Sequence, residues 1–212
     1  MGVTRILQVP YLVQPDPTWC QSTVLKMMAI YLDESVLHVS SDMQSKEIKD
    51  IWNDVNHGAH RPDKRQRNSL ANMKWWLQSH YPTLKVTYSE AHSEDAALDV
   101  LIRAINSGFP VLLSVSHTST LGHIILAVGY ENYEPLTSQP DFHLVIHDPY
   151  GRFDPTLKHR LFAKNRFDQG SCQMGGGQLG VGRYNRIPVT SARRARAHDA
   201  AFGTYRLMFC SK

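Results

Sequence analysis

The chain has 212 residues, of which 42% are hydrophobic and 20% are charged, with a formal net charge of +4 at pH 7 and a pI near 9.0. These values are typical of a globular protein with a substantial core, and the lack of an apolar run of about 18 residues excludes a transmembrane helix. The positive charge suits an anionic partner, such as nucleic acid, a membrane surface or the bacterial envelope, but it selects none of them.

The first ten residues and the cysteines indicate the cellular compartment in which the protein is made. Met1 to Pro10 lacks a long apolar stretch and a small-residue cleavage site, so we expect no secretory signal and synthesis in the cytoplasm. Export would then need a signal-independent route or release on lysis. The three cysteines, Cys20, Cys172 and Cys210, are scattered without a CxxC pair. This pattern argues against a disulfide framework and a cysteine-rich zinc site, and it predicts at least one free thiol.

The N-terminal segment leads to a cysteine at the start of a helix. Residues 6–13 alternate loosely around Pro10 and predict a short edge strand or an extended arm. Pro15 and Pro17 stiffen the following loop. Cys20 then begins a helix whose residues 22–32 are apolar on nearly all sides, which indicates a central, buried helix. Unpaired amides and the helix dipole at this position favour a thiolate.

The middle of the chain is predicted to be mostly helical. Apolar residues recur at helical spacing over residues 45–55, 69–80 and 94–107, the last ending at Gly108, and residues 84–89 alternate as a strand. A polar, basic loop spans residues 56–67.

The second half of the chain is predicted to be mostly strand. Residues 110–116, 122–130 and 142–147 form apolar runs separated by turn-rich segments, and residues 203–209 resemble a final strand. Strands joined by such loops usually pair antiparallel. Helices followed by strands predict an α+β fold with a cleft where the two layers meet.

Four polar residues stand out as a set for nucleophilic chemistry. Histidine is the common base for a thiol, and His123 begins a strand where its ring can face a cleft. Asp148 ends the next strand and could orient the histidine if the two strands are neighbours. Gln14, six residues before Cys20, could donate its amide to an oxyanion together with the Cys20 N–H.

Three segments resemble the motifs of a known family. They are Val9-Pro-Tyr with Gln14-x5-Cys20, then Gly122-His123-x4-Val128-Gly129-Tyr130, and then His147-Asp148-Pro149-Tyr150-Gly151. They resemble the bacteriocin-processing peptidase family, a branch of the papain-like cysteine peptidases. The resemblance implies that Cys20 is the nucleophile, His123 the general base, Asp148 its orienter and Gln14 the oxyanion donor.

The matched segments cover residues 9–32 and 109–151, and two departures narrow the resemblance. Gln21 follows the nucleophile where many members have glycine, and the membrane and ATP-binding domains of exporter-fused members are absent. The chain therefore resembles the stand-alone, C39-like members, and cleavage after a double-glycine leader is not implied. The tail from Pro155 to Arg196 matches no recognised pattern, so substrate choice could depend on it.

The resemblance implies one papain-like catalytic domain over residues 1–212. We expect a helical lobe over about residues 14–107, containing the central nucleophile helix, packed on an antiparallel sheet lobe over about residues 108–212 plus the N-terminal arm. Neither a cofactor nor a metal ion is expected.

Other patterns have simpler interpretations. His57 and His60, with His143 and His147 elsewhere, could be metal ligands, but the first pair lies in a polar loop without the i, i+4 spacing on a helix, so solvated histidines are predicted. The glycines between Gly175 and Gly182 lack the ending of a phosphate-binding loop and predict a flexible loop. A nucleic-acid interpretation rests on Arg193, Arg194 and Arg196 alone, which can equally form a solvated helical face. Cys172 and Cys210 are predicted to be structural.

The favoured function is a cysteine hydrolase that cleaves a peptide or amide bond through an acyl-enzyme. A peptide or protein substrate is expected, with bacterial cell-wall peptides as one hypothesis for an enzyme of bacterial or phage origin. Two alternatives stay open. The same triad could deamidate or transamidate glutamine on a host protein, as a secreted effector would, or the domain could bind peptides without cutting them. The sequence does not indicate an oligomeric state.

Overall fold

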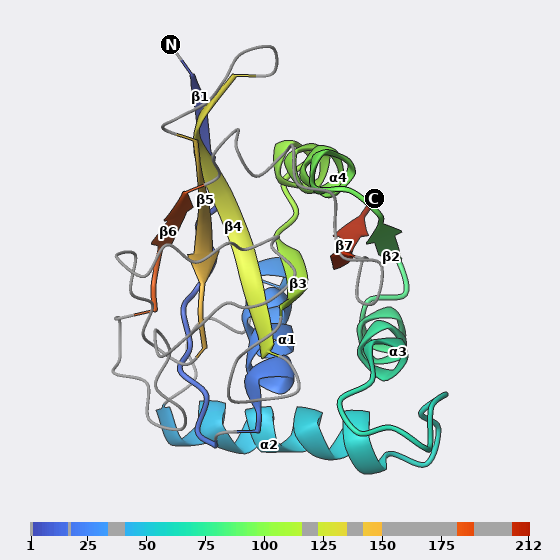
Figure 1. Cartoon of the computed structure of the whole chain (residues 1–212). Coiled ribbons are helices and arrows are strands. Elements are labelled where there is room, and N and C mark those ends of the chain that lie inside the picture. Colours follow the sequence, from blue (N-terminus) through green and yellow to red (C-terminus); the bar gives the residue numbers. More distant parts are fainter. Residues whose placement is uncertain are drawn as a thin grey trace.

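A computed structural model describes residues 2–16, 18–33, 41–115, 123–134, 142–149, 182–188 and 205–212. Within these residues the fold is α+β, as predicted (Figure 1). The helices are α1 (Cys20–Leu32), α2 (Ser41–His57), α3 (Leu70–His80) and α4 (Glu94–Asn106). The strands are β1 (Val3–Ile6), β2 (Lys85–Ala91), β3 (Val111–Val115), β4 (His123–Tyr133), β5 (His143–His147), β6 (Asn185–Pro188) and β7 (Tyr205–Ser211). The predictions for Gly122, Tyr150, Gly151, Cys172, Gly175 to Gly180 and the arginines of residues 193–196 lie outside the described residues.

The strands form one antiparallel sheet in the order β2-β7-β3-β4-β5-β6, and β1 pairs with β4. The runs predicted in the second half of the chain are neighbours, since β3 pairs with β4 and β4 with β5. Strand β2, which lies in sequence between α3 and α4, pairs with the last strand β7 along its full length. The sheet thus joins the two halves of the chain.

The structure differs from the predicted strands in two places. The N-terminal strand ends at Ile6, and residues 7–13 continue as the extended arm that was the other expectation for this segment. Pro10 has no N–H to give to a ladder, which explains why strand pairing does not extend through the arm. Strand β6 was not predicted, because its four residues carry no clear alternation; it pairs with β5.

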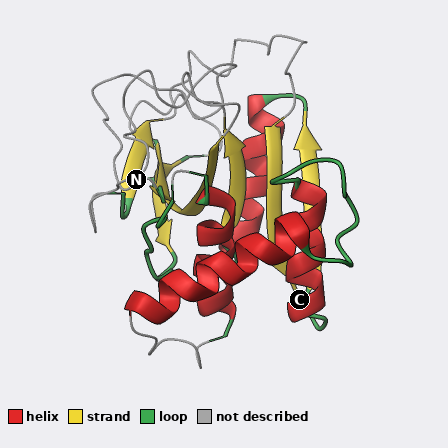
Figure 2. Ribbon diagram, turned by 90° about the horizontal axis from the view of Figure 1, so that it is seen from below, coloured by secondary structure: helices red, strands yellow, loops and turns green. Residues whose placement is uncertain are grey.

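Helix α1 is the buried centre of the molecule, as its composition predicts. Residues 20–30 are all buried, and the helix packs against α2, α3 and β4. In Figure 1 it lies behind β3 and β4, and in Figure 2, seen from below, the long α2 crosses in front of the strands. Each fully buried aliphatic side chain stabilises the fold by about 1.5–3 kcal/mol, so α1 is held firmly. Among the described helices, none is long and apolar enough to span a bilayer.

The ends of α4 follow local sequence rules. The Ser93 hydroxyl accepts a hydrogen bond from the N–H of Ala96, which caps the first turn. At the other end Gly108 has a φ of 87°, a left-handed conformation that costs glycine little and stops the helix.

Candidate active site

Cys20 is the first residue of α1 and follows a structured turn. The carboxylate of Asp16 accepts hydrogen bonds from the N–H and the hydroxyl of Thr18, at 2.8 and 2.7 Å, and the N–H of Trp19 donates to the carbonyl of Asp16 at 3.1 Å. The helix has no side-chain cap. Its first amide groups therefore remain available to an anion beside the sulfur. The thiol is free, and the residue is buried, with 8% of its surface exposed.

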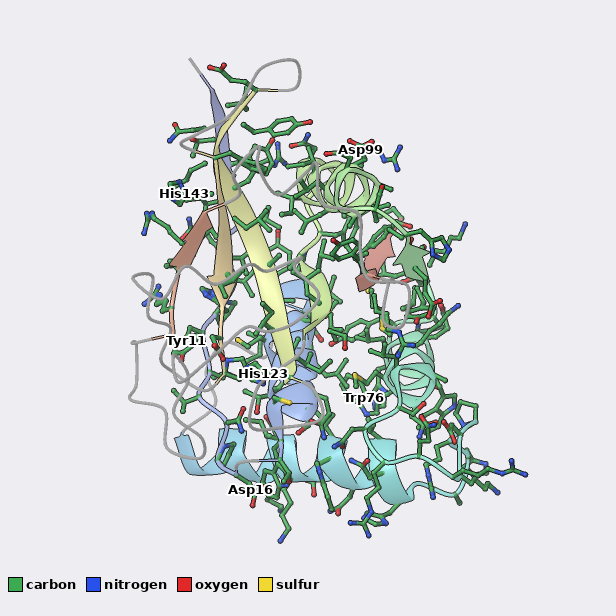
Figure 3. The ribbon with its side chains drawn as sticks, in the orientation of Figure 1. Tyr11, Asp16, Trp76, Asp99, His123 and His143 are labelled. Atoms are coloured by element: carbon green, nitrogen blue, oxygen red, sulfur yellow. The ribbon has the colours of Figure 1, made fainter. Side chains whose placement is uncertain are left out.

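His123 and Asp148 form a buried pair. Nε2 of His123 lies 2.8 Å from Oδ1 of Asp148, and both side chains are fully buried. The contact arises because β4 and β5 are antiparallel neighbours, so the start of one strand lies beside the end of the other. Figure 3 places His123 at the end of β4 that lies next to α1.

The backbone of Asp148 is held on both sides. Its N–H donates to the carbonyl of Gly182 at 3.0 Å, and its own carbonyl accepts the hydroxyl of Tyr11 at 2.9 Å. These bonds come from segments far apart in the sequence, one from the N-terminal arm and one from the approach to β6. The carboxylate is therefore presented to His123 from a fixed backbone.

Opposing effects act on the pKa of the His123 imidazole. Burial by itself lowers its pKa, but the charge of Asp148 and its hydrogen bond outweigh burial and raise the pKa to about 9. Cys20 also raises this pKa, by a smaller effect, so its side chain lies near the ring. Because Nε2 contacts Asp148, Nδ1 is the ring nitrogen available to Cys20. This arrangement can exchange a proton between sulfur and imidazole.

Gln14 is 2% exposed and is anchored beside the same pair. Its backbone N–H donates to the carbonyl of Pro149 at 2.9 Å, next to Asp148. Its side-chain Nε2 donates to the carbonyl of Asp16 at 2.7 Å, in the turn that leads to Cys20. One amide hydrogen is used there, which leaves a second N–H for another acceptor. Within the described residues Oε1 has no hydrogen-bond partner.

His147 was predicted to be solvated, and that prediction is wrong because it is completely buried. Its Nε2–H donates to the carbonyl of Val9 at 2.8 Å, and its Nδ1 accepts the N–H of Tyr184 at 3.1 Å. Burial lowers its pKa to about 4, so the ring is neutral at pH 7. His147 thus fastens the N-terminal arm and the segment before β6 to the end of β5. His57 and His60 are exposed, as predicted.

Two further residues near the site had no assigned role from the sequence. Tyr11 and His147 both stand in the segments quoted for the family resemblance, so the signal was present, but a motif alone does not say which members only support the backbone. In the described part of the chain no group of three or more His, Cys, Asp or Glu side chains could hold a metal ion.

Comparison with known proteins identifies the family of the chain. Residues 6–174 match the model of the Peptidase_C39 like family, a span that includes α1, β4, β5 and all four candidate residues. A search of curated proteins finds no match to the chain. The family match covers well over half of the sequence, and the chain accordingly belongs to the Peptidase_C39 like family of papain-like cysteine peptidases.

Proposed function

We propose that the protein is a cysteine peptidase in which Cys20 is the nucleophile, His123 the general base and acid, Asp148 the orienting group and Gln14 an oxyanion donor, in a papain-like arrangement of helices on an antiparallel sheet. The observation that carries the proposal is the buried His123–Asp148 pair, 2.8 Å apart, with the Cys20 sulfur as a further influence on the same ring. A histidine held by a carboxylate and coupled to a thiol is the arrangement that nucleophilic catalysis needs.

The steps follow from the positions of these groups. In the reactive form the proton of the Cys20 thiol resides on Nδ1 of His123, whose raised pKa retains it, and the thiolate attacks the carbonyl carbon of the scissile amide. The resulting oxyanion takes hydrogen bonds from the Cys20 N–H, at the uncapped start of α1, and from the amide of Gln14. The imidazolium gives its proton to the leaving amine as the C–N bond breaks. Water, deprotonated by His123, then cleaves the thioester.

Cys20→Ala should abolish peptide cleavage, with a loss of at least about 10³-fold, because the proposed thioester forms on the Cys20 sulfur. The matched control is Cys210→Ala, which removes a buried thiol from β7, on the other side of β3 from β4. Turnover of a fluorogenic peptide library is measured beside the melting temperature of each variant. Full activity of folded Cys20→Ala would remove the proposal.

The proposed substrate class is the peptide part of bacterial cell walls. The net charge of +4 supports it, since cell envelopes are anionic. Zymography on purified walls from several bacteria tests it, with Cys20→Ala as the negative control. Clearing by wild type alone is the expected result, and no clearing on any wall would exclude this substrate while leaving peptidase activity to the peptide assay.

The same residues could act on glutamine side chains of a protein. Mass spectrometry of treated lysates separates the two reactions, because hydrolysis of the backbone creates new termini whereas deamidation changes a side chain only. New termini are the outcome expected from the peptidase proposal.

A further inference from the structure

A second side chain contacts the nucleophile from within α1. The Cys20 thiol donates a hydrogen bond to Oε1 of Gln21, with 3.4 Å between sulfur and oxygen. Gln21 is completely buried, so this contact is shielded from water and retains its electrostatic strength. This residue stands where many relatives of the family resemblance have glycine, and the chemistry proposed above does not require it.

The orientation of the Gln21 amide is set by a chain of other amides. Its Nε2 donates to Oδ1 of Asn68, so its Oε1 must face the sulfur. Asn68 has a φ of 57°, a left-handed conformation that asparagine tolerates, and its N–H donates to Oδ1 of Asn56 at 2.6 Å. Asn56 in turn donates to the carbonyl of Trp52 at 2.9 Å. This chain of hydrogen bonds runs from α2, through Asn68 two residues before α3, to the nucleophile on α1.

Two groups therefore act on the sulfur in opposite senses. His123, backed by Asp148, favours the thiolate because an imidazolium attracts a negative sulfur. The Gln21 carbonyl oxygen favours the protonated thiol, because it accepts the S–H bond and its negative end repels a thiolate. Lys26, six residues further along α1, is paired with Glu47 of α2. In the described part of the chain, His123 on β4, with the carboxylate behind it, is a titratable group that interacts with Cys20.

We propose that Gln21, oriented by Asn68, is a positioning residue that restrains Cys20 as the protonated thiol in the free enzyme and limits its reactivity at neutral pH. The inference rests on the proposed function, since it concerns the same nucleophile. Gln21 would oppose the effect of the His123–Asp148 pair on the thiol. The orientation of its amide would depend on the packing of α2 and α3 that holds Asn68 in place.

The test is the rate at which iodoacetamide alkylates Cys20, followed by mass spectrometry across the pH range in the full chain. Gln21→Met keeps the length of the side chain but removes the carbonyl oxygen. The pH at which the alkylation rate is half its maximum, the pH midpoint, should move to lower pH in this variant. At pH values below the wild-type midpoint, the alkylation rate should rise by about three- to tenfold, the effect of one hydrogen bond. His123→Ala should move the midpoint in the opposite direction.

A matched pair at Asn68 separates positioning from folding. Asn68 is exposed, and glycine and aspartate both tolerate its backbone conformation, so the fold is preserved in either variant. Asn68→Gly removes the oxygen that holds Gln21 and should shift the midpoint in the direction of Gln21→Met. Asn68→Asp retains an acceptor at that point and should show no shift to lower pH.

The outcomes distinguish this inference from the function itself. The proposed role of Gln21 would be overturned, and the proposed function kept, if Gln21→Met and Asn68→Gly had the same pH midpoint as wild type while His123→Ala shifted it. Alkylation that does not depend on His123 would overturn the proposed nucleophile. Should Gln21→Met fail to fold, the Asn68 pair decides the question by itself, since a purely structural role would change melting temperature without moving the pH midpoint.

Discussion

Two buried histidines on adjacent strands have pKa values shifted in opposite directions. His123 begins β4 and His147 ends β5, and both are removed from water, which by itself lowers the pKa of each ring. The charge of Asp148 reverses the effect for His123, whose pKa is raised to about 9. His147 hydrogen-bonds to the backbone carbonyl of Val9 and the backbone N–H of Tyr184, and burial lowers its pKa to about 4. The groups that contact a buried imidazole, and not burial itself, decide whether the ring is charged or neutral at pH 7.

The largest difference between the two histidines should appear in turnover. His123→Ala should reduce peptide cleavage by at least about 10³-fold, because the proposed mechanism then lacks its base. His147→Gln should keep most of the activity, since glutamine can donate to Val9 and accept from Tyr184. Both variants are assayed with the same fluorogenic peptide. Equal losses in the two would show that the comparison is wrong.

Asp148→Asn tests whether the charge of the partner matters. Asparagine has nearly the same shape but cannot stabilise an imidazolium, so turnover should fall by about 10²-fold and the pKa of His123 should fall toward that of a buried neutral ring. The titration is followed through the C2 proton resonance of His123 by NMR. A His123 pKa unchanged by the substitution would mean that the carboxylate is not the cause of the raised pKa.

The next effect concerns stability. His147→Ala leaves the Val9 carbonyl and the Tyr184 N–H without partners and opens a cavity, so the free energy of unfolding should fall by about 3 kcal/mol. His147→Gln, which can restore both bonds, should lose clearly less. Urea unfolding at pH 7 measures both. A loss in the glutamine variant as large as in alanine would assign the effect to packing and not to the two hydrogen bonds.

The smallest effect is the slope of stability with pH. Between the unfolded pKa of 6.5 and about 9, only folded His123 holds its proton, so its contribution to stability is present below 6.5 and is lost as the pH rises through 9. Between 6.5 and about 4, only the unfolded form of His147 is protonated, so stability falls as the pH is lowered. Each slope is at most about 1.4 kcal/mol per pH unit.

Variants assign each slope to its histidine. Urea unfolding across this pH range should show that Asp148→Asn flattens the alkaline side and His147→Gln the acidic side. An acidic slope that persists in His147→Gln would show that other groups cause it. Asp63 acts at lower pH, because hydrogen bonds to its carboxylate from the N–H groups of Gln66 and Arg65 lower its pKa from 3.8, and their contribution is lost as the pH falls below that value.

Much of the architecture could be predicted from local patterns. The apolar repeats locate α1, α3 and α4 to within a few residues, because helical periodicity and the glycine at residue 108 are properties of neighbouring residues. The three strands β3, β4 and β5 were expected as antiparallel neighbours, since short connections favour that arrangement. Strand β6 has too few residues to show a pattern, and only its pairing with β5 identifies it.

The sequence by itself determined which residues could carry chemistry, through a thiol at a helix start, a histidine at a strand start and an aspartate at a strand end. The roles of Cys20, His123, Asp148 and Gln14 stay predictions. The sequence did indicate that Cys20 lies at a helix start, His123 at a strand start and Asp148 at a strand end. Only the tertiary structure decided that His147 is neutral and buried, that Tyr11 and Gly182 hold the backbone of Asp148, and that the chain of hydrogen bonds from Asn56 through Asn68 ends on Gln21. These contacts join residues distant in the chain, and their energies depend on burial and on the exact partner, neither of which a local pattern contains.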